Sequence, residues 1–111
     1  MNIKQNEVWM VRLGHSDSLG HEQRGTRPFF VVSNTEYNER SKTPVGFFMS
    51  TSRKKSKNRF SVEVSLCGKL EFVNVSQVRT LSDIRFIKKL GTCNDQDRAE
   101  IVSRFESQIL S

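Results

Sequence analysis

The stretch from Gly20 to Pro28 reads Gly-His-Glu-Gln-Arg-Gly-Thr-Arg-Pro and leads directly into the apolar run Phe29–Val32. Its two glycines allow the backbone to turn through positive φ, and the proline fixes φ where the chain becomes extended. The stretch therefore predicts a loop that feeds a strand. It carries an imidazole, a carboxylate and two guanidinium groups, which can bind a phosphodiester and move protons during its cleavage. By residue type alone, a solvent-exposed basic loop is the more ordinary interpretation.

The composition favours one compact domain with a basic surface. The chain has 111 residues, of which 35% are hydrophobic, and eight Phe and one Trp predict an aromatic-rich core. Eighteen Lys and Arg against twelve Asp and Glu give a net charge of +6, which favours a nucleic acid, an anionic membrane or an acidic protein segment as partner. The sequence has neither a membrane-length apolar run nor an N-terminal leader pattern, so we expect a cytoplasmic protein.

The two cysteines, Cys67 and Cys93, do not have the spacing of a metal site, and His15 and His21 do not complete a zinc set. We expect free thiols, no metal and no cofactor.

Apolar periodicity in the first half of the chain predicts three strands. The segment Glu7–Leu13 alternates with apolar residues on both faces, which is typical of a central strand. Phe29–Ser33 and Val45–Ser50 are short apolar strands, and the polar segment Asn34–Arg40 between them suits a single helical turn.

The second half predicts further strands and a C-terminal helix. Phe60–Leu66 alternates cleanly and pairs with Leu70–Val75 through a tight turn, and Phe86–Leu90 is a short extended segment that Gly91 ends. Asn94 is the expected N-cap of a helix over Asp95–Leu110. The apolar stripe of that helix comprises Ile101, Val102, Phe105, Ile109 and Leu110. Five or six short strands with one terminal helix predict a small, strongly bent antiparallel β-barrel.

A basic run from Arg53 to Arg59 holds five cations in seven residues. Such a run fits a solubilising hairpin loop, and it also fits contacts with an RNA backbone, because cations near phosphates release counterions. The sequence leaves both interpretations open.

Taken together and in this order, the motifs resemble the MazF/PemK/Kid family of toxins, and the PemK/Kid branch most closely, because His21 follows the first glycine. The matching segments are Glu7–Val11, Gly20–Pro28, Val31–Asn34, Ser50 with Thr51, and Gln77–Leu81. The resemblance implies a mainly β fold, an SH3-like antiparallel β-barrel with a C-terminal helix, spanning residues 1–111 as a single domain that forms homodimers.

The function implied by this resemblance is that of a sequence-specific endoribonuclease toxin, or mRNA interferase, of a type II toxin–antitoxin system. Such a protein cleaves single-stranded RNA without a metal and leaves 2',3'-cyclic phosphate and 5'-OH ends. An acidic antitoxin protein is the implied partner, and its carboxylates would cover the cations that RNA uses.

The resemblance also implies roles for individual residues. It assigns catalysis to Arg27, His21, Glu22, Ser50 and Thr51. The residues expected to bind RNA, some by this resemblance and those of the basic run by their charge, are Gln23, Arg24, Arg53, Lys54, Lys55, Gln77 and Arg79. A loop position for His21 that only touches RNA or the second subunit is the alternative to catalysis.

The chain departs from the family pattern at two positions. Many relatives have Asp or Glu where this chain has Ser76, and the Kid branch has Arg where it has Asn74. Neither side chain is a useful acid or base at neutral pH. The alternative function is therefore a non-catalytic binder on the same barrel, either a nucleic-acid-binding module or a CcdB-like toxin that binds gyrase.

Overall fold

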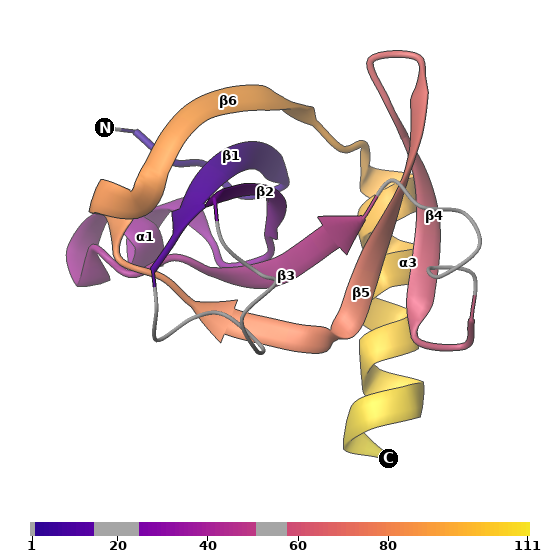
Figure 1. The fold of residues 1–111 in the computed structure, drawn as a ribbon. Helices are drawn as coiled ribbons and strands as arrows, with labels where there is room; N and C mark the ends of the chain where they lie inside the picture. The colour runs from indigo at the N-terminus through magenta and orange to yellow at the C-terminus, as the bar shows by residue number, and fades with distance from the viewer. Residues whose placement is uncertain (1, 15–24, 51–57) are drawn as a thin grey trace.

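The computed structural model describes residues 2–14, 25–50 and 58–111. Six strands form one antiparallel sheet in the order β4-β5-β3-β2-β1-β6. The strands are β1 (Glu7–Leu13), β2 (Gly25–Val31), β3 (Val45–Ser50), β4 (Ser61–Leu66), β5 (Lys69–Thr80) and β6 (Phe86–Thr92). The helical segments are α1 (Thr35–Ser41), η2 (Asp83–Arg85), α3 (Asp95–Phe105) and the π-helical turn η3 (Glu106–Leu110). The sheet curls into a half-barrel, and α3 lies against its β4–β5 side (Figure 1). The predicted mainly β fold with a C-terminal helix is confirmed.

Alternation along the strands gives the curled sheet a hydrophobic cluster on each face. On β1, Val8 contributes to one cluster while Trp9 and Val11 contribute to the other. On β3, Phe47 belongs to the cluster of Val8 and Phe48 to the other, and both are almost completely buried. Burying each such ring stabilises the fold by roughly 2 to 3 kcal/mol. The predicted aromatic-rich core and the central position of β1, between β2 and β6, are confirmed.

An irregularity in β5 produces the sharpest change in the sheet. Phe47 and Met49 are two residues apart in β3, but their partners in β5, Val78 and Val73, are five residues apart. The extra β5 residues interrupt the ladder and bend the strand. As a result, one long strand pairs with β4 through its first half and with β3 through both halves.

Three predicted boundaries are wrong because distant pairing extends the strands. β2 begins at Gly25, not Phe29, because residues 25–28 pair with β1, so this part of the predicted loop is strand. β5 continues beyond Val75 to Thr80, because its second half pairs with β3. β6 does not end at Gly91. There a Cβ would lie 2.7 Å from Leu66 Cδ1, so glycine permits close packing within the strand.

The C-terminal helix begins as predicted, with Asn94 Oδ1 accepting a hydrogen bond of 2.7 Å from the Asp97 backbone N–H. The prediction of its apolar stripe is confirmed only in part. Ile101 is buried and Phe105 packs against the core, but Ile109 and Leu110 are exposed because the last turns extend past the sheet (Figure 1).

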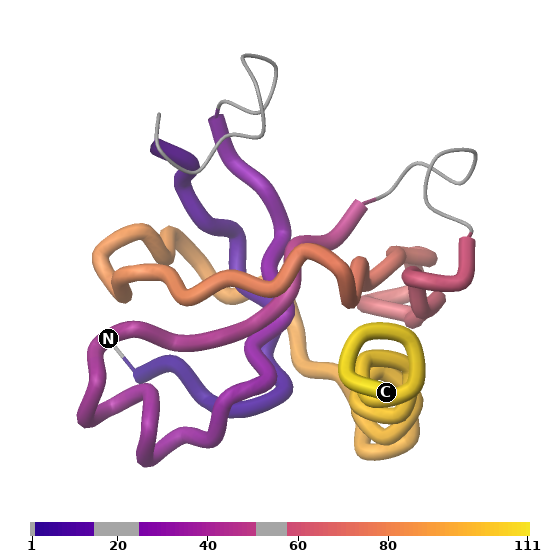
Figure 2. Tube along the Cα trace, turned by 90° about the horizontal axis from the view of Figure 1, so that it is seen from below, coloured from indigo at the N-terminus to yellow at the C-terminus, as the bar shows by residue number. Residues whose placement is uncertain are grey.

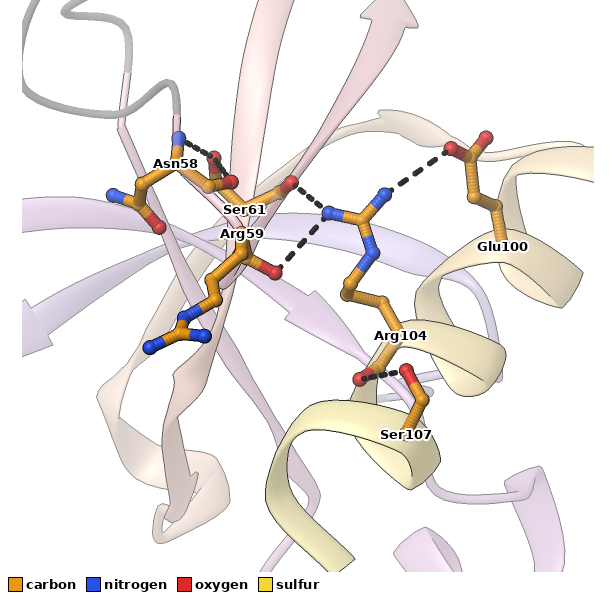
Figure 3. A network of polar contacts seen from close by, with 6 residues as sticks. All are labelled: Asn58, Arg59, Ser61, Glu100, Arg104 and Ser107. Atoms are coloured by element: carbon orange, nitrogen blue, oxygen red, sulfur yellow. Dashed lines mark hydrogen bonds and ion pairs between the residues drawn. The ribbon is translucent and has the colours of Figure 1, made fainter. Parts of the chain in front are cut away.

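A single arginine joins α3 to the start of β4 (Figure 3). Arg104 Nη1 donates hydrogen bonds to the carbonyl oxygens of Arg59, at 3.2 Å, and of Ser61, at 2.9 Å. Its Nη2 lies 3.9 Å from Glu100 Oε1, one helical turn back. These contacts fix the residues that enter β4.

Both cysteines are free, as predicted, with Cys67 exposed and Cys93 buried. No helix within the described residues is long and apolar enough to cross a membrane.

Candidate functional site

Arg27 lies in β2, where it pairs with Val11 of β1 and shares a sheet face with Phe29, two residues along the strand. Its guanidinium carbon lies 4.9 Å from the centroid of the Phe48 ring. Burial lowers the pKa of Arg27, but the group starts so far above neutrality that it stays protonated. The strand therefore holds a permanent, half-buried cation over an aromatic ring.

Ser50 ends β3 and is placed on the same face as Phe48, two residues earlier. The register between β2 and β3 pairs Phe29 with Phe48, and continuing it by two residues aligns Arg27 with Ser50. Figure 2 shows the start of β2 and the end of β3 lying apart from each other. The guanidinium and the hydroxyl thus belong to the diverging ends of two neighbouring strands, on one face of the sheet.

Two further predicted residues come from the second half of β5. Arg79 pairs with Gly46 of β3, which places Arg79 on the face that carries Phe48. Gln77 lies two residues earlier, within the irregular part of β5. The Oε1 atom of Gln77 is buried and has no hydrogen-bond partner among the described residues. An unpaired buried acceptor is costly, and a donor on a ligand could satisfy it.

The structure therefore places four predicted site residues, Arg27, Ser50, Gln77 and Arg79, on three adjacent strands. The other predicted site residues lie outside the described part of the chain: His21, Glu22, Gln23, Arg24, Thr51, Arg53, Lys54 and Lys55. The described ends next to those segments, where β1 ends and β2 begins and where β3 ends, lie on the same side of the molecule (Figure 2).

The two departures from the family pattern also lie on β5. Asn74 is half-buried and pairs with Ser61 of β4, whereas Ser76 is exposed beside Gln77. Ser76 places a hydroxyl in this part of the strand, where the Asp or Glu expected from the family pattern would place a carboxylate.

Sequence reasoning missed Phe48 as a site residue. Strand alternation could have placed it on the face of Ser50. Its contact with Arg27 depends on the pairing of β2 with β3, which the sequence pattern of either strand alone does not specify.

A groove of about 670 Å³ along α3 and η3 is separate from this cluster. Its lining includes Asp95, Val102 and Glu106, and none of it comes from β2, β3 or β5. Size alone does not make it the functional site, because the predicted chemistry-bearing residues lie elsewhere.

The cluster is suited to binding an anion. A guanidinium can pair with two phosphate oxygens while remaining charged, and a neighbouring hydroxyl can donate a further hydrogen bond. Across the part of the chain that the structure describes, no three His, Cys, Asp or Glu side chains are grouped so that they could hold a metal ion.

A strongly curled six-stranded sheet with a C-terminal helix is the fold of the MazF structures. The chain superposes on MazF from Deinococcus radiodurans with a TM-score of 0.81, covering 100% of this chain and 99% of that one at 21% identity. An endoribonuclease in complex with its cognate antitoxin, from a mycobacterial species, gives a TM-score of 0.76 at 19% identity, covering 95% and 92% of the two chains. At these identities the likeness shows the fold alone.

Sequence comparison supplies the family. Residues 4–109 match the family described as PemK-like, MazF-like toxin of type II toxin–antitoxin system, and the chain belongs to that family. A segment of 44 residues is also 36% identical to Endoribonuclease PemK of Escherichia coli. That match covers 40% of this chain and 32% of PemK, so it spans about a third of the relative's length.

Proposed function

We propose that this protein is a sequence-specific endoribonuclease toxin that cleaves single-stranded mRNA without a metal ion. The observation that carries the proposal is the family match over residues 4–109, in a chain that places Arg27 and Ser50 on the neighbouring strands β2 and β3. The PemK relative is itself called an endoribonuclease. The net charge of +6 suits a polyanionic substrate.

In the proposed reaction the ribose 2'-oxygen attacks the adjacent phosphorus and the bond to the 5'-oxygen breaks. The products are a 2',3'-cyclic phosphate and a 5'-OH. Arg27 binds the phosphate oxygens, and its charge stabilises the negative charge that develops on them. Ser50, together with Thr51, donates hydrogen bonds to the phosphate or the neighbouring sugar.

The reaction also needs two proton transfers, one from the 2'-OH and one to the leaving 5'-oxygen. We assign them to His21 and Glu22, because imidazole and carboxylate groups can exchange protons near neutral pH. Neither Asn74 nor Ser76 can take this role. Gln23, Arg24, Arg53, Lys54, Lys55, Gln77 and Arg79 are proposed to bind the RNA on either side of the scissile phosphate.

We further propose that the protein works as a homodimer of single-domain subunits in the cytoplasm, where mRNA is found, and that an acidic antitoxin neutralises it. One similar structure is an endoribonuclease with its cognate antitoxin, and another is a MazE–MazF complex. A basic surface attracts an acidic segment, which would then compete with RNA. Simultaneous tight binding of RNA and antitoxin would contradict this competition.

The function is tested by incubating the purified protein with a long RNA in excess EDTA and mapping the cleaved ends. We expect cleavage at a defined sequence, with cyclic phosphate and 5'-OH ends. Arg27→Ala should reduce the rate by about 100-fold or more without loss of fold, as expected when one donor to the developing charge is removed. RNA binding without cleavage by the wild-type protein would favour the non-catalytic alternative.

A further inference from the structure

The Arg27 guanidinium lies over the end of a continuous chain of aromatic rings. Phe48, the ring beneath it, is buried and meets Phe29 edge-on at 5.4 Å between centroids. Phe29 meets Phe86 at 5.8 Å, and Phe86 meets Trp9 at 6.0 Å, both also edge-on. These rings come from β1, β2, β3 and β6, so the position of Phe48 is fixed by most of the sheet.

We propose that Phe48 is a positioning residue for RNA cleavage, holding the Arg27 guanidinium over its ring in the orientation that the scissile phosphate requires. This inference rests on the proposed function, because it concerns the same arginine. Phe48 offers no group that could react with RNA, so its effect would pass entirely through Arg27.

The physical reason lies in the shape of the guanidinium. Its N–H donors lie in one plane and point outward from its edges, so contact between the guanidinium carbon and a ring does not use those donors. The face of an aromatic ring also attracts the cation, by about 0.5 to 2 kcal/mol depending on solvent exposure. This attraction partly offsets the cost of holding Arg27 half-buried and limits its alternative orientations.

Phe47 provides a matched control, because it is the next residue on β3, is equally buried and faces the opposite cluster. There it contacts Phe105, at 5.2 Å between centroids, and does not face Arg27. Replacing either ring by leucine removes a similar volume from the core. Only Phe48→Leu also removes the ring beneath the guanidinium.

The experiment measures kcat and KM for a short RNA containing one mapped cleavage site, at a temperature well below the melting transition of each variant. Phe48→Leu is expected to lower kcat about 2- to 30-fold, the loss that corresponds to a cation–π contact, with a smaller change in KM. Phe47→Leu should lower the melting temperature but leave kcat within about twofold of wild type. Phe48→Tyr, which keeps the ring face, should restore kcat per folded molecule.

A second measurement begins with the wild-type protein, and this first step does not depend on any variant folding. Protons above an aromatic face experience a ring-current shift, so the Arg27 Nε–H resonance of the wild-type protein should lie upfield of ordinary arginines. The shift should persist in Phe47→Leu and disappear in Phe48→Leu.

The inference is overturned if Phe48→Leu lowers kcat no more than Phe47→Leu does, or if the wild-type Arg27 resonance shows no upfield shift. Failure of the proposed function would look different. In that case Arg27→Ala would cleave RNA at the wild-type rate, or the wild-type protein would not cleave RNA at all.

Discussion

Trp9 Nε1 donates a hydrogen bond of 2.9 Å to Glu7 Oε1, within the strand that lies between β2 and β6. The same carboxylate oxygen accepts a bond of 2.8 Å from the Lys4 backbone N–H, and the other oxygen lies 3.1 Å from Lys89 Nζ on β6. Glu7 is only 5% exposed. A buried carboxylate with three donors is therefore a structural element of the sheet.

Glu7→Gln should lower the free energy of unfolding at pH 7 by about 1 to 3 kcal/mol, because the buried Trp9 N–H and the half-exposed Lys89 ammonium lose their charged acceptor. Burial raises the pKa of Glu7, but the hydrogen bonds from Lys4, Trp9 and Lys89 outweigh it and lower the pKa overall. This stabilisation is thus present above the unfolded-state pKa of about 4.3 and is lost as the pH falls through the folded-state value. Urea titrations across the acid range should show a steeper loss for wild type than for Glu7→Gln.

Glu71 is also buried, but its environment predicts that replacement by glutamine raises stability rather than lowering it. Its Oε2 atom has no hydrogen-bond partner among the described residues, and burial raises the pKa of Glu71 despite the nearby Lys69. The charged form therefore costs stability, and this cost appears as the pH rises through the folded-state pKa. Glu71→Gln should stabilise the protein by about 1 kcal/mol at pH 7, with the gain shrinking in acid. Destabilisation at pH 7 in the same urea assay would contradict this account.

The two thiols should differ in reactivity. Burial, with a smaller contribution from Asp97, raises the pKa of Cys93 to about 11, whereas Cys67 is exposed. Because the thiolate is the reactive form, iodoacetamide at about pH 8 should modify Cys67 and leave Cys93 intact until the protein unfolds. Mass spectrometry of the labelled peptides checks this result, and equal labelling in the native state would show that Cys93 is accessible.

Arg104→Met should lower the free energy of unfolding by about 1 to 3 kcal/mol, because Arg104 supplies the charged hydrogen bonds between α3 and the chain entering β4 (Figure 3). Arg40 is a matched control, since it forms a similar helical ion pair, 3.8 Å from Glu36, on an exposed surface. Arg40→Met should change stability by less than about 0.5 kcal/mol. Equal effects in thermal or urea unfolding would refute the role of the carbonyl contacts.

The candidate site residues were proposed from the sequence because their residue types are chemically distinctive. Arg27 and Ser50 were predicted through family resemblance, and their roles stay predictions; the structure places them on the neighbouring strands β2 and β3. Phe48 was not predicted, since a phenylalanine in an apolar strand is indistinguishable from a core residue until its neighbours are known. Likewise, nothing in the sequence separates Glu7 from Glu71. Both are buried, but the fold brings Lys89 of β6 to Glu7 and leaves Oε2 of Glu71 without a hydrogen-bond partner among the described residues.

The sequence by itself determined the features that depend on residues close together in the chain. The Asn94 cap of α3, the two-sided apolar pattern of β1 and the boundaries of β3 arise from interactions or periodicity within a few residues. Only the tertiary structure decided the start of β2 at Gly25, the irregular step in β5 and the position of the Phe48 ring beneath Arg27. Each of these depends on which distant strands pair and in which register, and that choice minimises the free energy of the whole sheet rather than of any one segment.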